Sequence, residues 1–184
     1  MSRIKKLFQL IIDGRYSWVL RYYLYKSINK NIKGNGYFGK PIFISGFNNI
    51  SIESNFGIFP GGRIEVEKGK LIIKSGVRIG HNILIDNSSK ITIKENVVIS
   101  ANVYIGSTKY IIHNDRTGYK DWNIEGKNIV IGSNSFIGFG AVILPGTILG
   151  DYCVVGANAV ANGIYPDGSV ISAANSKIMR SRFE

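Results

Sequence analysis

The sequence predicts an all-β fold, in which the chain coils into a parallel β-helix behind a short N-terminal α-helical segment. Two observations predict this fold. From about residue 42, an aliphatic residue recurs every six positions and is often followed by glycine. The first 30 residues carry instead the apolar spacing of amphipathic helices. A hydrophobic share of 45% among 184 residues is enough to fill one core.

The N-terminal segment is expected to be helical up to about residue 30. Residues 4–12 place their apolar side chains on one helical face, and after Gly14 a second stripe resumes one residue out of phase. Two helices or one kinked helix would both explain this shift. Gly34, Gly36 and Gly39 then indicate a linker. We therefore expect a helical segment with its linker at 1–40 and a β-helix domain at 41–184.

The six-residue period describes a triangular prism. The position four residues after many aliphatic anchors is small or β-branched, so each six residues supply two inward positions, which is one flat face. Three faces make a coil of about eighteen residues, and the coils stack as parallel strands. A β-sandwich would show a period of two, with turns every 8–12 residues or so. The anchors are Ile52, Ile58, Ile64, Ile73, Ile79, Ile85, Ile91, Ile93, Ile99, Ile105, Ile131, Ile137, Ile143, Leu149 and Val155.

One segment interrupts the repeat and is the candidate functional region. Residues 113–128 are polar and lack the period, so we expect a loop excursion from the prism, and loops carry function more often than scaffolds do. His113 stands where the last strand before the excursion ends. Its imidazole is suited to take a proton from a hydroxyl near neutral pH, although spacing alone explains it equally well as a surface loop residue. His81 is interpreted as an exposed corner residue.

The net charge of +11 is concentrated at the N-terminus, where residues 1–40 hold nine lysines and arginines against Asp13 alone. A nucleic-acid partner is not expected, because such proteins usually spread their basic residues over the folded body. A basic amphipathic segment fits an anionic membrane surface, whereas the competing interpretation is a cap over the end of the β-helix. No stretch reads as a signal peptide or a membrane span. We expect a cytoplasmic location, with peripheral contact at the inner membrane face as an extension of it.

Residues 129–180 resemble the C-terminal half of the hexapeptide-repeat acyltransferases. The ladder of Ile-Gly hexads and the turn Leu144-Pro145-Gly146 carry the resemblance, which extends less tightly back to Ile42. The chain is similar to galactoside and maltose acetyltransferases and to bacterial polysaccharide O-acetyltransferases. The resemblance implies a left-handed β-helix and a homotrimer, with acetyl-CoA as acyl donor in a cleft between subunits. No metal site is expected, because two histidines cannot supply the three histidine ligands of a β-helix carbonic anhydrase.

The resemblance also implies roles for individual residues. His113 matches the general base that removes the acceptor's proton during direct acetyl transfer, without a covalent acyl-enzyme. Asn82 matches an asparagine that lines the acceptor site, and it could project toward His113 from a neighbouring coil.

The donor site implied by the resemblance lies on the late coils. Backbone groups around Gly138 and Ala157 would hold CoA, Phe136 would form an aromatic wall, and Lys177 and Arg180 would meet the CoA phosphates. For these two cations a solvated basic tail is an equally good interpretation. The family's proline is missing from residues 173–177, and Asn162-Gly163 replaces a frequent lysine.

The predicted function is transfer of acetyl from acetyl-CoA to a saccharide hydroxyl in bacterial surface-polysaccharide synthesis, with a lipid-linked saccharide among the acceptors considered. Two alternatives stay open at this point. One is N-acetylation of an amino-sugar nucleotide. The other is a non-catalytic β-helix that serves as a binding or structural module.

Overall fold

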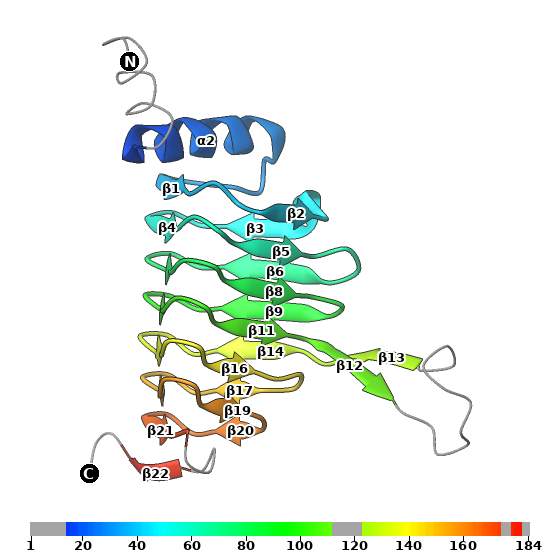
Figure 1. Ribbon diagram of the computed structural model, residues 1–184, viewed down its shortest axis with the longest axis vertical. Helices are drawn as coiled ribbons and strands as arrows, with labels where there is room; N and C mark the ends of the chain where they lie inside the picture. The colour runs from blue at the N-terminus through cyan, green and yellow to red at the C-terminus, as the bar shows by residue number, and fades with distance from the viewer. Residues whose placement is uncertain (1–13, 112–122, 174–177, 182–184) are drawn as a thin grey trace, which may run out of the picture.

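The computed structural model describes residues 14–111, 123–173 and 178–181. Within these ranges the chain forms a parallel β-helix with helix α2 (Arg15–Ile28) lying across its N-terminal end (Figure 1). The predicted fold class is confirmed. Residues 4–12, for which a helix was predicted, lie outside the described residues.

The strands form three sheets, one on each face of the prism, and the chain visits the faces in a fixed order. The first face contains β1 (Gly36–Phe38), β4 (Phe56–Ile58), β7 (Arg78–Ile79), β10 (Val98–Ile99), β15 (Phe136–Ile137), β18 (Val154–Val155), β21 (Ser169–Ile171) and β22 (Ile178–Ser181). The second contains β2 (Phe43–Ser45), β5 (Arg63–Glu65), β8 (Leu84–Asp86), β11 (Tyr104–Gly106), β16 (Val142–Ile143) and β19 (Val160–Ala161). The third contains β3 (Ile50–Ile52), β6 (Lys70–Ile73), β9 (Lys90–Ile93), β14 (Ile129–Ile131), β17 (Ile148–Leu149) and β20 (Ile164–Tyr165). A single 3-10 turn, η1 (Phe47–Asn49), joins β2 to β3.

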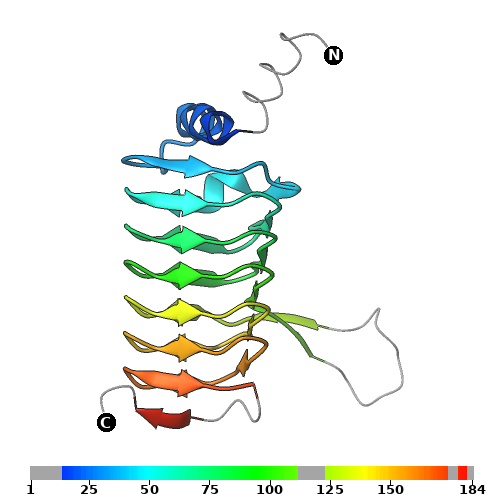
Figure 2. The ribbon, with the colours of Figure 1, turned by 60° about the vertical axis from the view of Figure 1, so that its left-hand side comes forward.

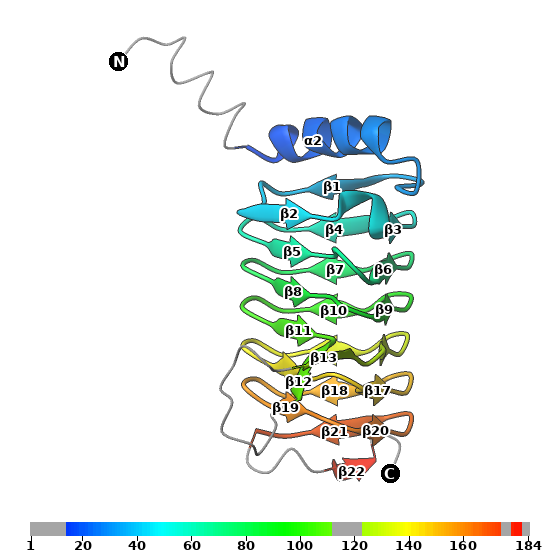
Figure 3. The same ribbon diagram turned by 90° about the vertical axis from the view of Figure 1, so that its right-hand side faces the viewer.

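The coil is left-handed, as the family resemblance implied. Viewed from the N-terminal end, the chain passes from the first face to the second and then the third counterclockwise while it moves away from the viewer (Figures 1 and 3). All pairs within the three faces are parallel except β21 with β22, which is antiparallel.

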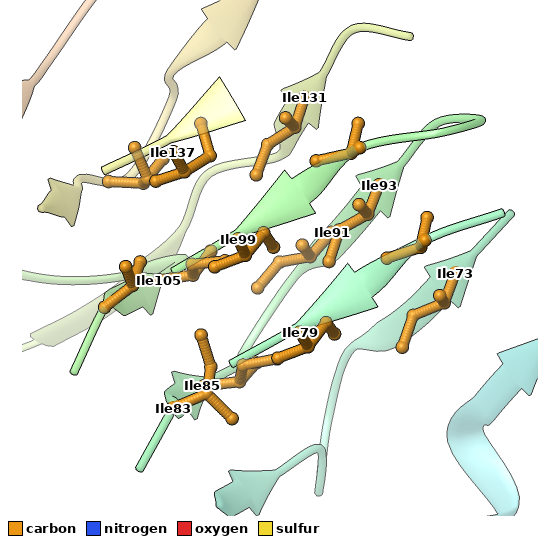
Figure 4. Packing of buried hydrophobic residues seen from close by; sticks show 14 of the residues in the cluster. Ile73, Ile79, Ile83, Ile85, Ile91, Ile93, Ile99, Ile105, Ile131 and Ile137 are labelled. Carbon is orange, nitrogen blue, oxygen red and sulfur yellow. The ribbon is translucent and has the colours of Figure 1, made fainter. Parts of the chain in front are cut away.

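The core confirms the six-residue repeat. Every predicted anchor is buried, and so are the small residues four positions later, such as Val97, Ala141 and Cys153. Parallel pairing places anchors of successive coils directly over one another, as with Ile79, Ile99 and Ile137 (Figure 4). Each fully buried isoleucine contributes about 1.5–3 kcal/mol through loss of apolar surface from water.

Asparagines form two of the prism's corners. Six of the seven non-glycine residues with positive φ in the described part of the chain are asparagines, with φ between 55° and 59°. Asparagine tolerates this left-handed conformation better than other non-glycine residues. At Gly76, an added Cβ would lie 2.1 Å from the Oδ1 of Asn96 on the next coil, so the corner side chains stack along the prism edge.

Helix α2 covers the first coil. Tyr22 is 2% exposed and meets the ring of Phe56 at 5.7 Å, while Tyr25 meets the ring of Phe38 at 5.0 Å. The segment expected as a linker is already part of the β-helix from Gly36 on, because β1 pairs with β4 and buries Phe38. The domain boundary near residue 40 stays a prediction. Within the described residues, no helix has the length and apolar character needed to cross a bilayer.

Replacing Asn96 by valine should lower the free energy of unfolding by about 1–2 kcal/mol, because a β-branched residue is strained in the left-handed region. Asn96 has φ 57°, and glycine adopts this conformation without strain. The change Asn96→Gly should therefore cost much less than Asn96→Val in urea unfolding. Equal losses in the two variants would contradict the role assigned to the corner.

Candidate functional site

The predicted loop excursion begins as a β-hairpin. Strands β12 (Thr108–Ile111) and β13 (Asn123–Gly126) pair antiparallel, with Lys109 opposite Glu125, and the hairpin projects away from the prism (Figure 2). It leaves the corner between the second and third faces, after β11 and before β14. The excursion was expected over 113–128, so the structure places its start several residues earlier. Sequence reasoning missed the paired strands because a short antiparallel ribbon carries no six-residue period.

Ser107 anchors the root of this hairpin. Its fully buried Oγ donates to Asn87 Oδ1 at 3.2 Å and accepts the backbone N–H groups of Ser88 and Ser89, both at 3.0 Å. Its own N–H donates to the carbonyl of Asp86 at 2.9 Å. One hydroxyl thus joins two successive coils where the chain leaves the prism, so the base of the hairpin is held by the scaffold.

A polar pocket of about 200 Å³ lies at this root. Asp86 accepts a hydrogen bond from Thr108 Oγ1 at 3.1 Å, and Tyr110 and Ile124 of the hairpin form a less polar wall. Because the pocket combines three carboxylates with an amine, an amide and hydroxyls, its chemistry suits a ligand with many hydroxyl groups. Its lining consists of Glu65, Glu67, Lys68, Asp86, Asn87, Ser88, Thr108, Tyr110 and Ile124.

Two groups near the pocket have unusual environments. Asn87 is 3% exposed, and within the described part of the chain its Nδ2 has no hydrogen-bond partner. A buried amide nitrogen without a partner is costly, and the residue that carries it belongs to the lining of the pocket. Burial raises the pKa of the Tyr104 hydroxyl, and the nearby carboxylate of Asp86 raises it further, so this hydroxyl stays protonated at neutral pH. Neither Asp86 nor Asn87 was among the candidate site residues predicted from the sequence.

His113, the predicted general base, lies outside the described residues. The structure describes the strand before it up to Ile111 and the strand after it from Asn123. Its catalytic role therefore stays a prediction.

The structure explains Asn82 first as a corner residue. Asn82 has φ 55°, is exposed, and lies between β7 and β8 at the corner between the first and second faces. The hairpin root lies at the other edge of the second face, so one chain does not bring Asn82 and the pocket together. The same corner holds Gly140 and Asn158 on later coils.

Three of the predicted donor-site residues are neighbours at this corner. Gly138 and Ala157 are stacked on successive coils, since a Cβ on Gly138 would lie 2.6 Å from the backbone nitrogen of Ala157. Phe136 is 44% exposed on the preceding strand, opposite Val98 and Val154. Phe139, which sequence reasoning missed, adds a second aromatic ring that is 49% exposed. Whether these residues hold CoA stays a prediction.

The roles predicted for Lys177 and Arg180 in binding the CoA phosphates stay predictions. Lys177 lies outside the described residues. Arg180 belongs to β22, whose backbone pairs with β21, so this part of the expected basic tail is a strand. Among the described residues, no group of three or more histidine, cysteine, aspartate or glutamate side chains is arranged to hold a metal ion.

Comparison with known proteins shows which family part of this chain resembles. Residues 128–163 match the family described as bacterial transferase hexapeptide (six repeats). The predicted resemblance to the hexapeptide-repeat acyltransferases is thereby confirmed for this part of the β-helix.

Its individual relatives are acyltransferases by name. A putative lipopolysaccharide biosynthesis O-acetyl transferase, WbbJ of Escherichia coli K12, is 28% identical over 151 residues, which cover 76% of each chain. The galactoside O-acetyltransferase of the same organism is 28% identical over 112 residues, covering 58% of this chain and 54% of the relative. A solved structure of AntD, an N-acyltransferase from Bacillus cereus in complex with dTDP-4-amino-4,6-dideoxyglucose and coenzyme A, shares the fold with a TM-score of 0.70 and 18% identity, covering 84% of this chain and 82% of AntD.

Replacing Phe136 by alanine should weaken CoA binding about tenfold, because an aromatic contact is worth roughly 1 kcal/mol beyond its area. The side chain points outward, so its loss should leave the melting temperature nearly unchanged. Val98→Ala is the matched control, since Val98 is its cross-strand partner and is 42% exposed. Calorimetric titration with CoA measures both variants, and equal affinity of Phe136→Ala and wild type would remove Phe136 from the donor site.

Proposed function

We propose that this chain is an acetyl-CoA-dependent O-acetyltransferase that acetylates a hydroxyl of a saccharide in bacterial surface-polysaccharide synthesis. The names of its sequence relatives support the acetyltransferase class, and one of them is assigned to lipopolysaccharide biosynthesis. The observation that carries the saccharide acceptor is the polar pocket at the hairpin root.

The chemistry of the pocket fits a sugar ring. Carboxylates such as Asp86 accept hydrogen bonds from sugar hydroxyls, and the ammonium group of Lys68 donates to a sugar oxygen. Tyr110 and Ile124 offer apolar surface to the less polar face of the ring. Because the hairpin that forms this wall also leads to His113, the predicted base belongs to the segment that borders the acceptor.

The proposed transfer is a single displacement. The acceptor oxygen attacks the thioester carbonyl of acetyl-CoA while His113 takes its proton. The carbon–sulfur bond then breaks, and the departing thiolate receives the proton from His113 as CoA leaves. The products are the acetyl ester and the free CoA thiol, so the step needs neither a metal nor a covalent acyl-enzyme.

The proposal includes a homotrimer. The acceptor pocket lies at the corner between the second and third faces, whereas Asn82, Gly138 and Ala157 lie at the corner between the first and second faces. One chain therefore holds the two parts of the site on different edges, and a neighbouring chain is needed to bring them together. The hairpin supports this, since Tyr110 and Ile124 are each 55% exposed.

Transfer to the amine of an amino-sugar nucleotide is the second candidate. The AntD structure, which binds such a nucleotide with the same fold, favours including these acceptors in the assay. The pocket's many polar groups distinguish either enzyme from a purely structural β-helix.

Replacing His113 by alanine should lower kcat by about 10²–10⁴-fold, because a positioned general base contributes that much to proton transfer. Release of the CoA thiol from acetyl-CoA measures turnover across a panel of saccharides and amino-sugar nucleotides. His81→Ala is the matched control, because it removes the chain's other histidine. Undiminished turnover in His113→Ala would exclude the proposed base.

Replacing Asp86 by asparagine should raise the KM for the saccharide about tenfold and leave the KM for acetyl-CoA unchanged, because a charge-assisted hydrogen bond contributes roughly 1.5–3 kcal/mol. The asparagine oxygen still accepts the bond from Thr108, so the hairpin root is preserved. Asp167→Asn is the control, since Asp167 also accepts a hydrogen bond, from Asp151 N at 2.8 Å, but lies away from the pocket. A change in the KM for acetyl-CoA alone would contradict the assignment.

A further inference from the structure

Helix α2 has two apolar faces, and the β-helix covers only one of them. Trp18, Tyr22 and Tyr25 face the β-helix and contact aromatic rings of its first two coils. On the opposite face, Leu20 is 63% exposed and Tyr23 is 63% exposed. We call this second face the outer stripe of α2, which consists of Tyr16, Leu20, Tyr23 and Leu24.

The exposure of the outer stripe is unusual for a surface helix. All four residues are between 57% and 79% exposed, and Val19 and Ile28 extend the apolar surface at its borders with 42% and 61%. Contiguous exposed apolar surface of this kind marks a site of interaction, because it costs free energy in water. Beside Val19, an apolar recess of about 290 Å³ opens between Trp18, Tyr37 and Phe59.

The charge around the stripe identifies its partner as anionic. Residues 14–52 contain no aspartate or glutamate, but they contain six lysines and arginines. Arg21 and Lys26 lie along the borders of the helix and donate to the backbone carbonyls of Phe38 and Gly34, respectively. Lys30 and Lys33 are exposed beyond the end of the helix. A second copy of this end would bring two clusters of like charge together, which disfavours it as the occupant.

The orientation of α2 fits a flat surface. The helix lies across the N-terminal end of the prism (Figures 1 and 3). Its outer stripe therefore points away from the β-helix, and a plane can contact the whole stripe at once. An apolar face with tyrosines and flanking basic residues is typical of helices that lie in the interface of a bilayer.

We propose that the outer stripe of α2 docks this chain on an anionic lipid bilayer, with the β-helix standing away from the membrane on its N-terminal end. The aliphatic side chains enter the boundary between headgroups and acyl chains, and the surrounding cations attract anionic headgroups. This proposal is independent of acetyl transfer. In such a position, lipid-linked saccharides would lie on the same surface as the protein.

Vesicle co-sedimentation of the full chain tests the proposal. The chain should bind vesicles of phosphatidylcholine with an equal share of phosphatidylglycerol, bind phosphatidylcholine alone much less, and lose binding at high salt. Leu20→Glu should weaken the partition about tenfold, because it places a carboxylate in the apolar contact. Ile164→Glu is the matched control: Ile164 is 76% exposed on β20, far from α2 in sequence, and its replacement should leave binding unchanged.

Three outcomes would overturn the proposal. One is that the full chain does not bind the vesicles. This outcome holds even if removal of residues 1–13 restores binding, because that segment would then be the occupant of the stripe. Another is undiminished binding by Leu20→Glu, which would place the lipid contact elsewhere. The third is that the chain binds no vesicles and shows a doubled particle mass that Leu20→Glu abolishes. This result would assign the stripe to a second copy.

Discussion

The structure depends on the alignment of buried side chains between coils. Each face of a coil contributes two inward residues, and parallel pairing sets each of them directly over its equivalent on the coil before. Isoleucine recurs in these columns because its branched side chain fills the space between two coils without a polar atom. A shift of one residue would turn the anchors outward, so the register of every strand is tied to the register of its neighbours.

The irregular parts of the chain gather at one corner of the prism. The interval between anchors is longer than six residues from Ile64 to Ile73, from Ile85 to Ile93 and, with the hairpin, from Ile105 to Ile131. All three intervals cross the corner between the second and third faces. At two corners, asparagines and glycines in the left-handed backbone conformation keep the coil in register. The third corner tolerates insertions. The polar pocket lies where the largest insertion begins.

The core could be predicted from the sequence because its signal is periodic. The six-residue aliphatic repeat and the small residues that follow each aliphatic position depend only on neighbours along the chain, and each coil repeats them. The pocket could not be predicted in this way. Asp86 and Asn87 belong to one coil and Thr108 to the next, and the hydrogen bonds of Ser107 and Thr108 that join the two coils are encoded by no local pattern. The grouping of Gly138 with Ala157 was expected from a family resemblance, and their stacking follows from the coil length. The outer stripe of α2 coincides with the apolar stripe that the sequence shows after Gly14, whereas the inward face of Trp18, Tyr22 and Tyr25 was not predicted.

The first face of the β-helix is covered in different ways at its two ends. A parallel coil offers unpaired backbone groups at each end, which is a template for adding further strands. At the N-terminal end α2 lies over β1, and at the C-terminal end β22 runs antiparallel to β21. A strand of reversed direction interrupts the left-handed winding, so another coil cannot continue it in register. The chain therefore resists growth into filaments, to which an open stack of identical coils would be prone.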